Sequence, residues 1–345
     1  MFYMADKNTK NADIVAVANA AKVSISTVSR SFNHPELVNP ATRKKIDRAV
    51  RKLGYIRNRA AQTMHGIRSG TIGLVLPTID NVIFAEVIQA FSESVDAHGF
   101  TILVASHGYD LEREYAVLRK FLEHRVDGVA LIGLDHSEET YQLIDSQAIP
   151  AITIWNYDAA SRLSCVGADN WQAGRLAAQH LIDLGHREIA VVFPPVAGND
   201  RARARHDGAM SVLSRHCCDL PPAWTQQARY SIADGKEAVI NLLRADRRPT
   251  AILCGNDVLA VGAIHAARRL DLGVPEDLSI IGIGDFKGSK EMEPALTTIS
   301  LPARAIGEIA GEQLAQSIVQ EDHQIRRTDC AISLAKRDTC QVCTT

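Results

Sequence analysis

From residue 71 onward, short apolar runs alternate with longer amphipathic stretches, and this alternation constrains the fold more than any other feature. The apolar runs are TIGLVLP, FTILVAS, DGVALIG, PAITIW, REIAVVF, PTAILCG and LSIIGIG. Helical periodicity separates them, for example at 84–97, 111–124, 171–184 and 257–270. Apolar strands that alternate with helices form parallel sheets covered on both faces. The pattern predicts an α/β body of two doubly wound parallel sheets that face each other across a cleft.

Doubly wound sheets bind ligands at the carboxyl ends of their strands, so residues that closely follow a predicted strand are candidates for a small-molecule site. They are Ile83, Phe84, Arg201, Arg203, Arg205, Tyr230, Asn256, Asp257 and Asp285. A sugar site needs an apolar plate and fixed polar groups. Two simpler interpretations stay open: Phe84 can belong to the core, and Asp257 can cap the helix that begins there.

The charge of the chain is divided unevenly. Residues 1–70 contain 13 Lys and Arg against 4 Asp and Glu, a net charge of +9, whereas the remainder contains 25 against 36, a net charge of −11. A basic head on an acidic body predicts that the head meets a polyanion, because neutralising phosphates releases counterions. A merely solvated basic N-terminus is the alternative.

Within this head, residues 13–20 and the stretch that follows Ser24 read as two short helices joined by a tight turn. Ser24 can cap the second helix, where Val28 and Phe32 share the face that packs on the first. Ile25, Ser26, Ser29 and Arg30 then point outward. Small hydroxyls with one Arg suit a helix that enters the DNA major groove, where Arg can bind guanine.

A third helix is predicted after Asn39, with Pro40 at its first position and Gly54 at its end. A helix of about two turns from Asn58, carrying Met64, comes next, and it is marginal alone in water. We expect it to form only when paired with its copy on DNA.

In this head, the segment from VAVANAAKVSISTVSRSFN to LGYIRNRAAQTM resembles the DNA-binding head and hinge helix of the lactose-repressor (LacI/GalR) family. The resemblance implies that Ile25, Ser26 and Arg30 read bases, and that Met64 occupies the position of the Leu that wedges into the minor groove. The DNA-binding set is Ser24, Ile25, Ser26, Thr27, Ser29, Arg30, Asn33, Tyr55, Asn58, Arg59 and Met64. Within it, the phosphates are held by Ser24, Thr27, Ser29, Asn33, Tyr55 and Asn58.

The resemblance continues through GHREIAVV, RPTAILCGND, GVPEDLSIIGIGDF and PALTTISLP, and implies a core similar to periplasmic sugar-binding proteins. The implied domains are a helix-turn-helix head at 1–56, a hinge at 57–70 and a core at 71–337. The core's N-subdomain is 71–170 with 300–330, its C-subdomain is 171–299 with 331–337, and 338–345 is expected to be an unstructured tail. The chain then crosses between the lobes three times.

By family position, Arg205 is the main residue that grips the effector, while Phe84, Tyr230 and Trp171 supply apolar surface. Asp169 and Asn256 are secondary candidates, although Asp169 can simply cap the helix near Trp171. Family members often carry two acidic or amide residues where this chain has Gly284 and Asp285. Three alternate arginines with one carboxylate fewer favour an acidic sugar, and GLDH at 133–136 with GIGDF resembles the gluconate-type branch. A neutral sugar stays open.

Enzyme motifs are missing from the sequence. It contains no G-x-S-x-G and no H-E-x-x-H, and GIGDFKG has Lys287 where a dinucleotide site needs Gly. The lone CQVC at 340–343 stands without a second pair, so no catalytic residue, metal or cofactor is expected. Seven scattered cysteines, no long apolar run and no signal-like start lead us to expect a cytoplasmic protein.

Together these features predict a homodimeric repressor of carbohydrate-utilisation genes. Its affinity for double-stranded operator DNA would be set by a small sugar, sugar acid or sugar phosphate, without a membrane partner. The alternative is a sugar-binding protein without DNA function, which leaves the basic head unexplained.

Overall fold

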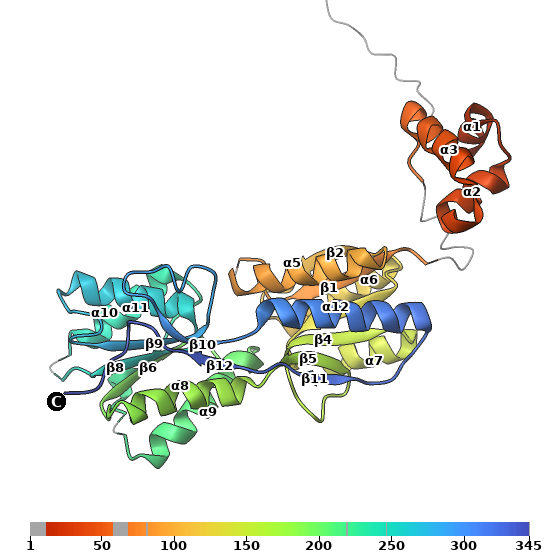
Figure 1. The fold of residues 1–345 in the computed structure, drawn as a ribbon. Coiled ribbons are helices and arrows are strands. Elements are labelled where there is room, and N and C mark those ends of the chain that lie inside the picture. The colour runs from red at the N-terminus through yellow and green to blue at the C-terminus, as the bar shows by residue number, and fades with distance from the viewer. Residues whose placement is uncertain (1–11, 58–67, 81, 219, 246, 345) are drawn as a thin grey trace, which may run out of the picture. The chain divides into compact units, whose positions relative to one another are not determined.

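The computed structural model describes residues 12–57, 68–80, 82–218, 220–245 and 247–344. The chain divides into two compact units, Met1–Ser69 and Gly70–Thr345 (Figure 1). The predicted hinge helix falls almost entirely within 58–67, outside the described residues, and so do Asn58, Arg59 and Met64.

The first unit is a bundle of short helices around a small apolar core. Its elements are α1 (Ile14–Ala21), α2 (Ile25–Asn33), the 3-10 turn η1 (Pro35–Leu37) and α3 (Pro40–Leu53). Val17, Val28 and Ile46, one from each α-helix, are completely buried in its centre. Phe32 packs at the edge of this core with its ring centroid 6.2 Å from that of Tyr55.

The ends of these helices are set by the residues that the sequence indicated. Ser24 caps α2 by accepting a hydrogen bond from the Thr27 N–H at 3.1 Å, and Asn39 caps α3 through the Ala41 N–H at 2.9 Å. Gly54 ends α3 in the left-handed region at φ +59°. Lys22 adopts φ +56° in the turn between α1 and α2, where glycine would be unstrained.

In the second unit, the first sheet is entirely parallel and has the strand order β11-β5-β4-β3-β1-β2. Its strands are β1 (Thr71–Leu76), β2 (Thr101–Ser106), β3 (Gly128–Ile132), β4 (Ala151–Asn156), β5 (Ser164–Ala168) and β11 (Arg327–Asp329). Helices α5 (Val82–Ala97) and α12 (Ala303–Gln320) cover one face, and α6 (Leu111–Glu123) and α7 (Glu138–Gln147) cover the other. This layered body is the N-lobe.

A second sheet, of order β12-β10-β9-β8-β6-β7, forms the C-lobe and is parallel except for the antiparallel pair β10–β12. Its strands are β6 (Ile189–Phe193), β7 (Thr225–Gln227), β8 (Ala251–Cys254), β9 (Ser279–Gly284), β10 (Thr297–Ser300) and β12 (Ser333–Ala335). The helices are α8 (Asn170–Asp183) and α9 (Asp200–Arg215) on one face, α10 (Ile232–Leu243) and α11 (Asp257–Arg269) on the other, and the 3-10 turn η2 (Pro222–Trp224). The predicted pair of doubly wound sheets is confirmed.

The side chains of each strand are buried alternately on the two faces of the sheet, which explains why helices cover both faces. In β1, Leu74 packs with α5 and α12, whereas its neighbour Val75 packs with α6 and α7. Successive side chains point to opposite faces of a strand, so a strand buried on both sides reads as a continuous apolar run.

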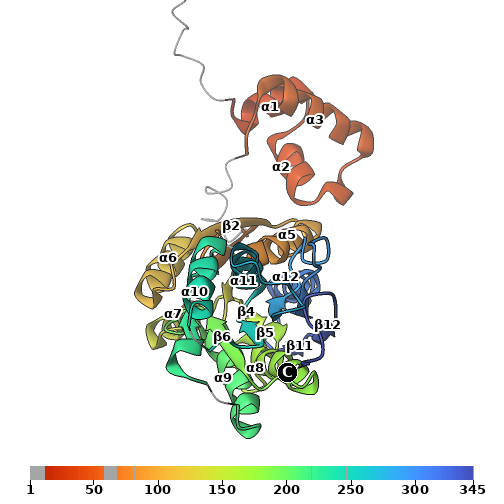
Figure 2. The ribbon, with the colours of Figure 1, turned by 90° about the vertical axis from the view of Figure 1, so that its left-hand side faces the viewer.

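Three segments connect the lobes: β5 to α8, β10 to α12, and β11 to β12. Figure 1 shows the N-lobe and C-lobe beside each other with these connections between them, and Figure 2 shows the molecule turned by 90°. Each lobe is therefore assembled from segments that are far apart in the sequence.

The C-terminal segment 338–344 is not the unstructured tail that the sequence suggested. Thr339 is completely buried; its hydroxyl donates to the Ile280 carbonyl at 2.6 Å and accepts from the Thr297 N–H at 2.9 Å. The Cys340 thiol also donates to the Ile280 carbonyl, and burial raises its pKa to about 12. These backbone groups of the sheet are satisfied by the segment, which explains why it packs there. None of the helices described here is long and apolar enough to cross a bilayer.

Candidate functional site

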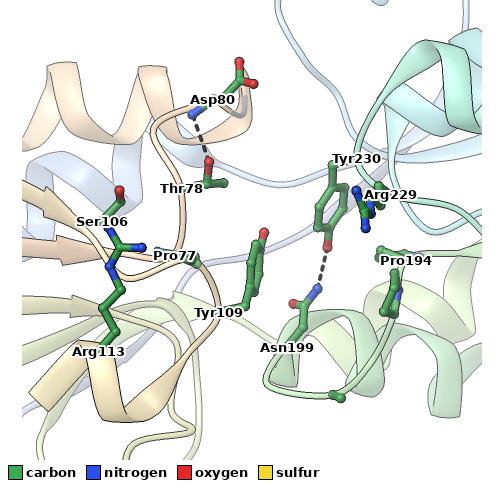
Figure 3. Close-up of a pocket in the computed structure, with 13 residues that line it drawn as sticks. Pro77, Thr78, Asp80, Ser106, Tyr109, Arg113, Pro194, Asn199, Arg229 and Tyr230 are labelled. Atoms are coloured by element: carbon green, nitrogen blue, oxygen red, sulfur yellow. Dashed lines mark hydrogen bonds between the residues drawn. The ribbon is translucent and has the colours of Figure 1, made fainter.

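A cavity of about 510 Å³ opens between the lobes, at the carboxyl ends of strands from both sheets (Figure 3). Its N-lobe wall follows β1 and β2, and its C-lobe wall follows β6 and β7. The lining residues are Pro77, Thr78, Asp80, Ser106, Gly108, Tyr109, Arg113, Pro194, Pro195, Ala197, Asn199, Arg229 and Tyr230. This is the place where doubly wound sheets bind ligands, and its size suits a small molecule.

Two tyrosines, one from each lobe, face each other in this cavity. The rings of Tyr109 and Tyr230 are nearly parallel, with an interplanar angle of 24° and centroids 6.4 Å apart. The Tyr230 hydroxyl accepts a hydrogen bond from the Asn199 amide at 3.0 Å. Burial raises the pKa of Tyr109, so its hydroxyl remains protonated at neutral pH. The pair offers the flat apolar surface that the C–H face of a sugar needs.

Next to the cavity, Asp200 at the start of α9 ties the two lobes together. One carboxylate oxygen accepts from the Leu134 N–H at 2.6 Å and from the Asn156 side-chain amide at 2.7 Å, both in the N-lobe. The other oxygen accepts from the backbone and guanidinium of Arg201, each at 2.8 Å. Because Asp200 and Arg201 are buried, these bonds act in a low-dielectric setting where they are stronger than in water.

Arg201 and Arg203 both reach across to the N-lobe. Arg201 donates to the Ile132 carbonyl at 3.4 Å, and its guanidinium lies 6.0 Å from the ring centre of Phe84. Arg203 forms an ion pair with Asp135 at 2.6 Å. These two side chains therefore connect the lobes to each other, and neither lines the cavity.

Arg205 is the largest buried cation in the core, with a side chain almost completely inaccessible to solvent. It donates to the Asn170 side chain at 2.7 Å and to the Gly255 carbonyl at 3.1 Å, and no carboxylate among the described residues pairs with it. Desolvation lowers its pKa to about 10, which leaves it charged at neutral pH. Its charge lowers the pKa of Tyr109, against the larger effect of burial.

Asn256 is also buried beside this group, directly after Gly255. Its side-chain oxygen caps α11 through the Leu259 N–H at 3.0 Å, while its amide nitrogen has no hydrogen-bond partner within the described residues. Asn256 is therefore the cap that the sequence assigned to Asp257. A buried donor without a partner is costly, which makes this amide a candidate for ligand contact.

Asp257 instead anchors the loop that follows β9. It accepts from the Phe286 N–H at 2.9 Å and from the hydroxyls of Ser289 and Thr298 at 2.8 and 2.6 Å. Asp285, in the same loop, forms an ion pair with Arg337 at 2.5 Å.

The predicted effector residues fall into separate groups. Tyr230 lines the cavity, and Arg205 and Asn256 lie close together near it. Phe84 is buried in the core with its ring edge-on to Trp155, and Asp169 caps α8 through the Gln172 N–H. Ile83 and Asp285 line a different cavity, of about 330 Å³, and Trp171 is 41% exposed beneath the Arg175 guanidinium.

Sequence reasoning overlooked the other polar lining residues of the cavity: Thr78, Asp80, Ser106, Tyr109, Arg113, Asn199 and Arg229. The sequence did contain a signal for Tyr109, because HGYD directly follows the predicted strand FTILVAS. Ligands bind at the carboxyl ends of such strands, so Tyr109 was a candidate by the same argument as Tyr230. Arg229 directly precedes Tyr230 and Asn199 lies two residues before Arg201, so both are close in the sequence to residues that were chosen.

On the first unit, α2 presents an exposed polar surface of the predicted kind. Ile25, Ser26 and Arg30 are exposed, and Ile25 retains 46% of its accessible surface. The Ser24 hydroxyl lies 2.8 Å from that of Ser26 and 2.7 Å from that of Thr27, so the start of the helix is a connected cluster of hydroxyls.

The remaining predicted DNA contacts in the described head lie next to this surface. Ser29, Asn33 and Tyr55 are partly exposed. The Asn33 amide donates to the Ser29 hydroxyl at 3.4 Å and its oxygen accepts from the Arg57 guanidinium. Arg57 also lies 5.6 Å from the centre of the Phe32 ring. These contacts fix polar groups at the end of the exposed face of α2.

No group of three or more His, Cys, Asp or Glu side chains in the described ranges is arranged to hold a metal ion. All seven cysteines are free thiols.

Comparison with known proteins gives a consistent result for both units. Residues 13–58 match the family model described as bacterial regulatory proteins, lacI family, and residues 178–340 match that of a periplasmic binding protein-like domain. The HTH-type transcriptional repressor PurR of Klebsiella pneumoniae subsp. pneumoniae is 30% identical over 328 residues, which cover 94% of this chain and 96% of that protein.

Two solved structures extend the similarity to the fold. The Lac repressor dimer bound to operator and the anti-inducer ONPF superposes with a TM-score of 0.83 at 26% identity, covering 96% of this chain and 100% of that one. A complex of the transcriptional regulator CelR with cellobiose gives a TM-score of 0.69 at 25% identity, with 95% and 99% covered.

Proposed function

The chain belongs to the LacI family of bacterial regulatory proteins, and we propose that it represses transcription under the control of a small carbohydrate-type effector bound in the interlobe cavity. Its relatives are DNA-binding transcriptional repressors. We expect it to act as a homodimer in the cytoplasm, on a near-palindromic operator.

For the DNA-binding head, the proposal assigns base reading to Ile25, Ser26 and Arg30, since these residues are exposed on α2. Ser24, Thr27, Ser29, Asn33 and Tyr55 would position the helix through phosphates. Asn58, Arg59 and Met64 keep their assignment to the hinge as a proposal from sequence.

The observation that carries the effector proposal is the pair Arg205 and Asn256. Among the described residues, the buried Arg205 guanidinium has no carboxylate partner and the buried Asn256 amide nitrogen has no acceptor, which is costly in a folded protein unless a ligand supplies the missing partners. Both lie near the cavity tyrosines, at the end of the strands where ligands bind. We therefore propose that these donors grip ligand oxygens while Tyr109 and Tyr230 contact the sugar's apolar face. The complex of the relative CelR with cellobiose supports a carbohydrate.

Control of DNA binding would follow from linkage between the lobes and the head. An effector that contacts both lobes shifts their relative orientation, and a marginal hinge helix amplifies that shift. A coupling of about 1–3 kcal/mol changes operator affinity by roughly 5–150-fold.

The test combines a thermal-shift screen with an operator-binding assay. Sugars, sugar acids and sugar phosphates are screened for stabilisation of the full chain, and the best binder is then added to fluorescent DNA from upstream of its own gene. Arg205→Ala should abolish the response to the effector. Without effector, the operator affinity of this variant should stay within about twofold of that of the original protein. Arg215→Ala, which removes an exposed arginine from the same helix, is the control.

A loss of folding in Arg205→Ala would identify a structural role, so Tyr230→Ala is measured in parallel, because Tyr230 is only partly buried. If both variants fold and both respond to the effector like the original protein, the cavity is not the effector site.

A further inference from the structure

The interlobe cavity is lined by two arginines that form no ion pair. Arg113 projects from the first turns of α6 in the N-lobe, and Arg229 precedes Tyr230 in the C-lobe. Both are exposed, and neither guanidinium has a hydrogen bond or a carboxylate partner among the residues that the structure describes. Of the described residues that line the cavity, Asp80 is the single one with an acidic side chain, and no ion pair joins it to either arginine there.

The arginines that sequence reasoning assigned to the ligand are in a different situation. Arg201 is neutralised by Asp200 at 2.8 Å, and Arg203 by Asp135 at 2.6 Å. Arg205 is engaged by Asn170 and a backbone carbonyl. The cationic groups that remain available at the cavity wall are therefore Arg113 and Arg229.

The positive charge at the cavity wall contrasts with the net negative charge of residues 71–345. Residues 71–345 contain 25 Lys and Arg against 36 Asp and Glu, so the body as a whole repels anions. Within it, Arg113, Arg229 and the nearby Arg205 gather around one concave site with a single lining carboxylate. A cleft lined by one sign of charge focuses the field and concentrates small ions of the opposite sign.

From this arrangement we infer that the effector carries an anionic group, a carboxylate or a phosphate, which binds at the cavity wall to Arg113 or to Arg229. Figure 3 shows the two guanidinium groups on opposite sides of the tyrosine pair. Arginine binds both anions with charge-assisted hydrogen bonds. Because the tyrosine pair lies between them, each guanidinium would bind an anionic group at its own end of the cavity. This inference rests on the proposed effector function of the cavity and adds the charge of its ligand.

The first experiment tests the charge without knowledge of the ligand. Thermal unfolding of the full chain is followed in inorganic phosphate and in acetate, each against chloride at constant ionic strength. At least one of the two anions should raise the midpoint, and the variant Arg113→Gln with Arg229→Gln should lose that rise. The control variant, Arg119→Gln with Arg215→Gln, removes the same charge from exposed positions of α6 and α9. Because the control variant keeps the basic head unchanged, a rise caused by phosphate bound to the head would persist in it. The inference is wrong if the cavity variant keeps the full rise.

The second experiment separates the two anion classes and tests the proposed function independently. Calorimetry compares gluconate, glucose 6-phosphate and glucose as probes. We expect one acidic sugar to bind, with affinity reduced about tenfold by Arg113→Gln or by Arg229→Gln, whichever removes the cation that holds the anionic group. Glucose that binds equally to the original protein and the double variant would overturn the inference and leave the cavity proposal intact. Anion stabilisation lost in the cavity variant, with no sugar bound, would support the anionic site and contradict the carbohydrate effector.

Discussion

Replacing Asp200 with Ala should destabilise the core more than any exposed substitution, because this carboxylate serves both lobes at once. It accepts four hydrogen bonds, two from Arg201 in its own lobe and two from Leu134 and Asn156 in the other. The substitution leaves a buried guanidinium without its anion and a backbone N–H without an acceptor.

The expected cost follows from these contacts. Breaking a buried ion pair by removing one partner costs about 3–5 kcal/mol. For a domain of this size that corresponds to a fall of roughly 6–20 °C in the unfolding midpoint. Asp207→Ala removes a carboxylate from the same helix that is 59% exposed and pairs only with His206, so its midpoint should change by less than about 2 °C.

The assay is thermal unfolding of the full chain followed by circular dichroism, with a double-mutant cycle that adds Asn156→Ala. A charge-assisted bond between Asp200 and Asn156 should give a coupling energy of about 1–3 kcal/mol across the lobes. Equal midpoints for Asp200→Ala and Asp207→Ala, or a coupling near zero, would show that the lobes are held together elsewhere.

Four other variants or conditions test separate parts of the structure. Arg30→Ala should cost about 1–3 kcal/mol on operator and clearly less on random DNA in anisotropy titrations; equal losses would make it a phosphate contact. Gly174→Ala should lower the unfolding midpoint by several degrees, since its Cβ would collide with the Arg205 backbone carbonyl where α8 crosses α9. Thr339→Val should cost about 2 kcal/mol, because the buried Thr297 N–H loses its acceptor and the Ile280 carbonyl keeps only the weak Cys340 thiol as a side-chain donor, whereas an unchanged midpoint would mean that the segment is dispensable. Burial lowers the pKa of His186 below its usual 6.5, so His186 takes up a proton at a higher pH in the unfolded chain than in the folded one. The free energy of unfolding should therefore fall as the pH drops below 6.5, and His186→Asn should weaken that pH dependence.

Most of the fold could be predicted because strand burial and helix capping are local signals. The apolar run TIGLVLP became β1, and Ser24, Asn39 and Gly54 ended helices as their chemistry requires. The segment 338–344 could not be predicted in this way, since its polar sequence indicates a tail. Only the starts of β9 and β10, which are far from it in the sequence, supply the hydrogen-bond partners of the buried Thr339.

The candidate site was harder to predict for a related reason. The sequence shows that Arg201, Arg203 and Arg205 are arginines near a strand end, and it does not show where their counter-ions are. Asp135 and Asp200 come from different lobes, and their pairing with arginines depends on the tertiary arrangement. The cations left unpaired, Arg113 and Arg229, are identified only after this pairing is known.

The order in which the chain is synthesised has a consequence for its assembly. Helix α12 and β11 complete the N-lobe, and β12 with the segment that follows completes the C-lobe, although both lobes begin far earlier in the sequence. Neither lobe can close its sheet before residues 327–335 have been synthesised, so the sensor folds later than the head. The head needs only residues before 58 for its own core. A prematurely terminated product would therefore retain a folded DNA-binding tip without the body that senses the effector.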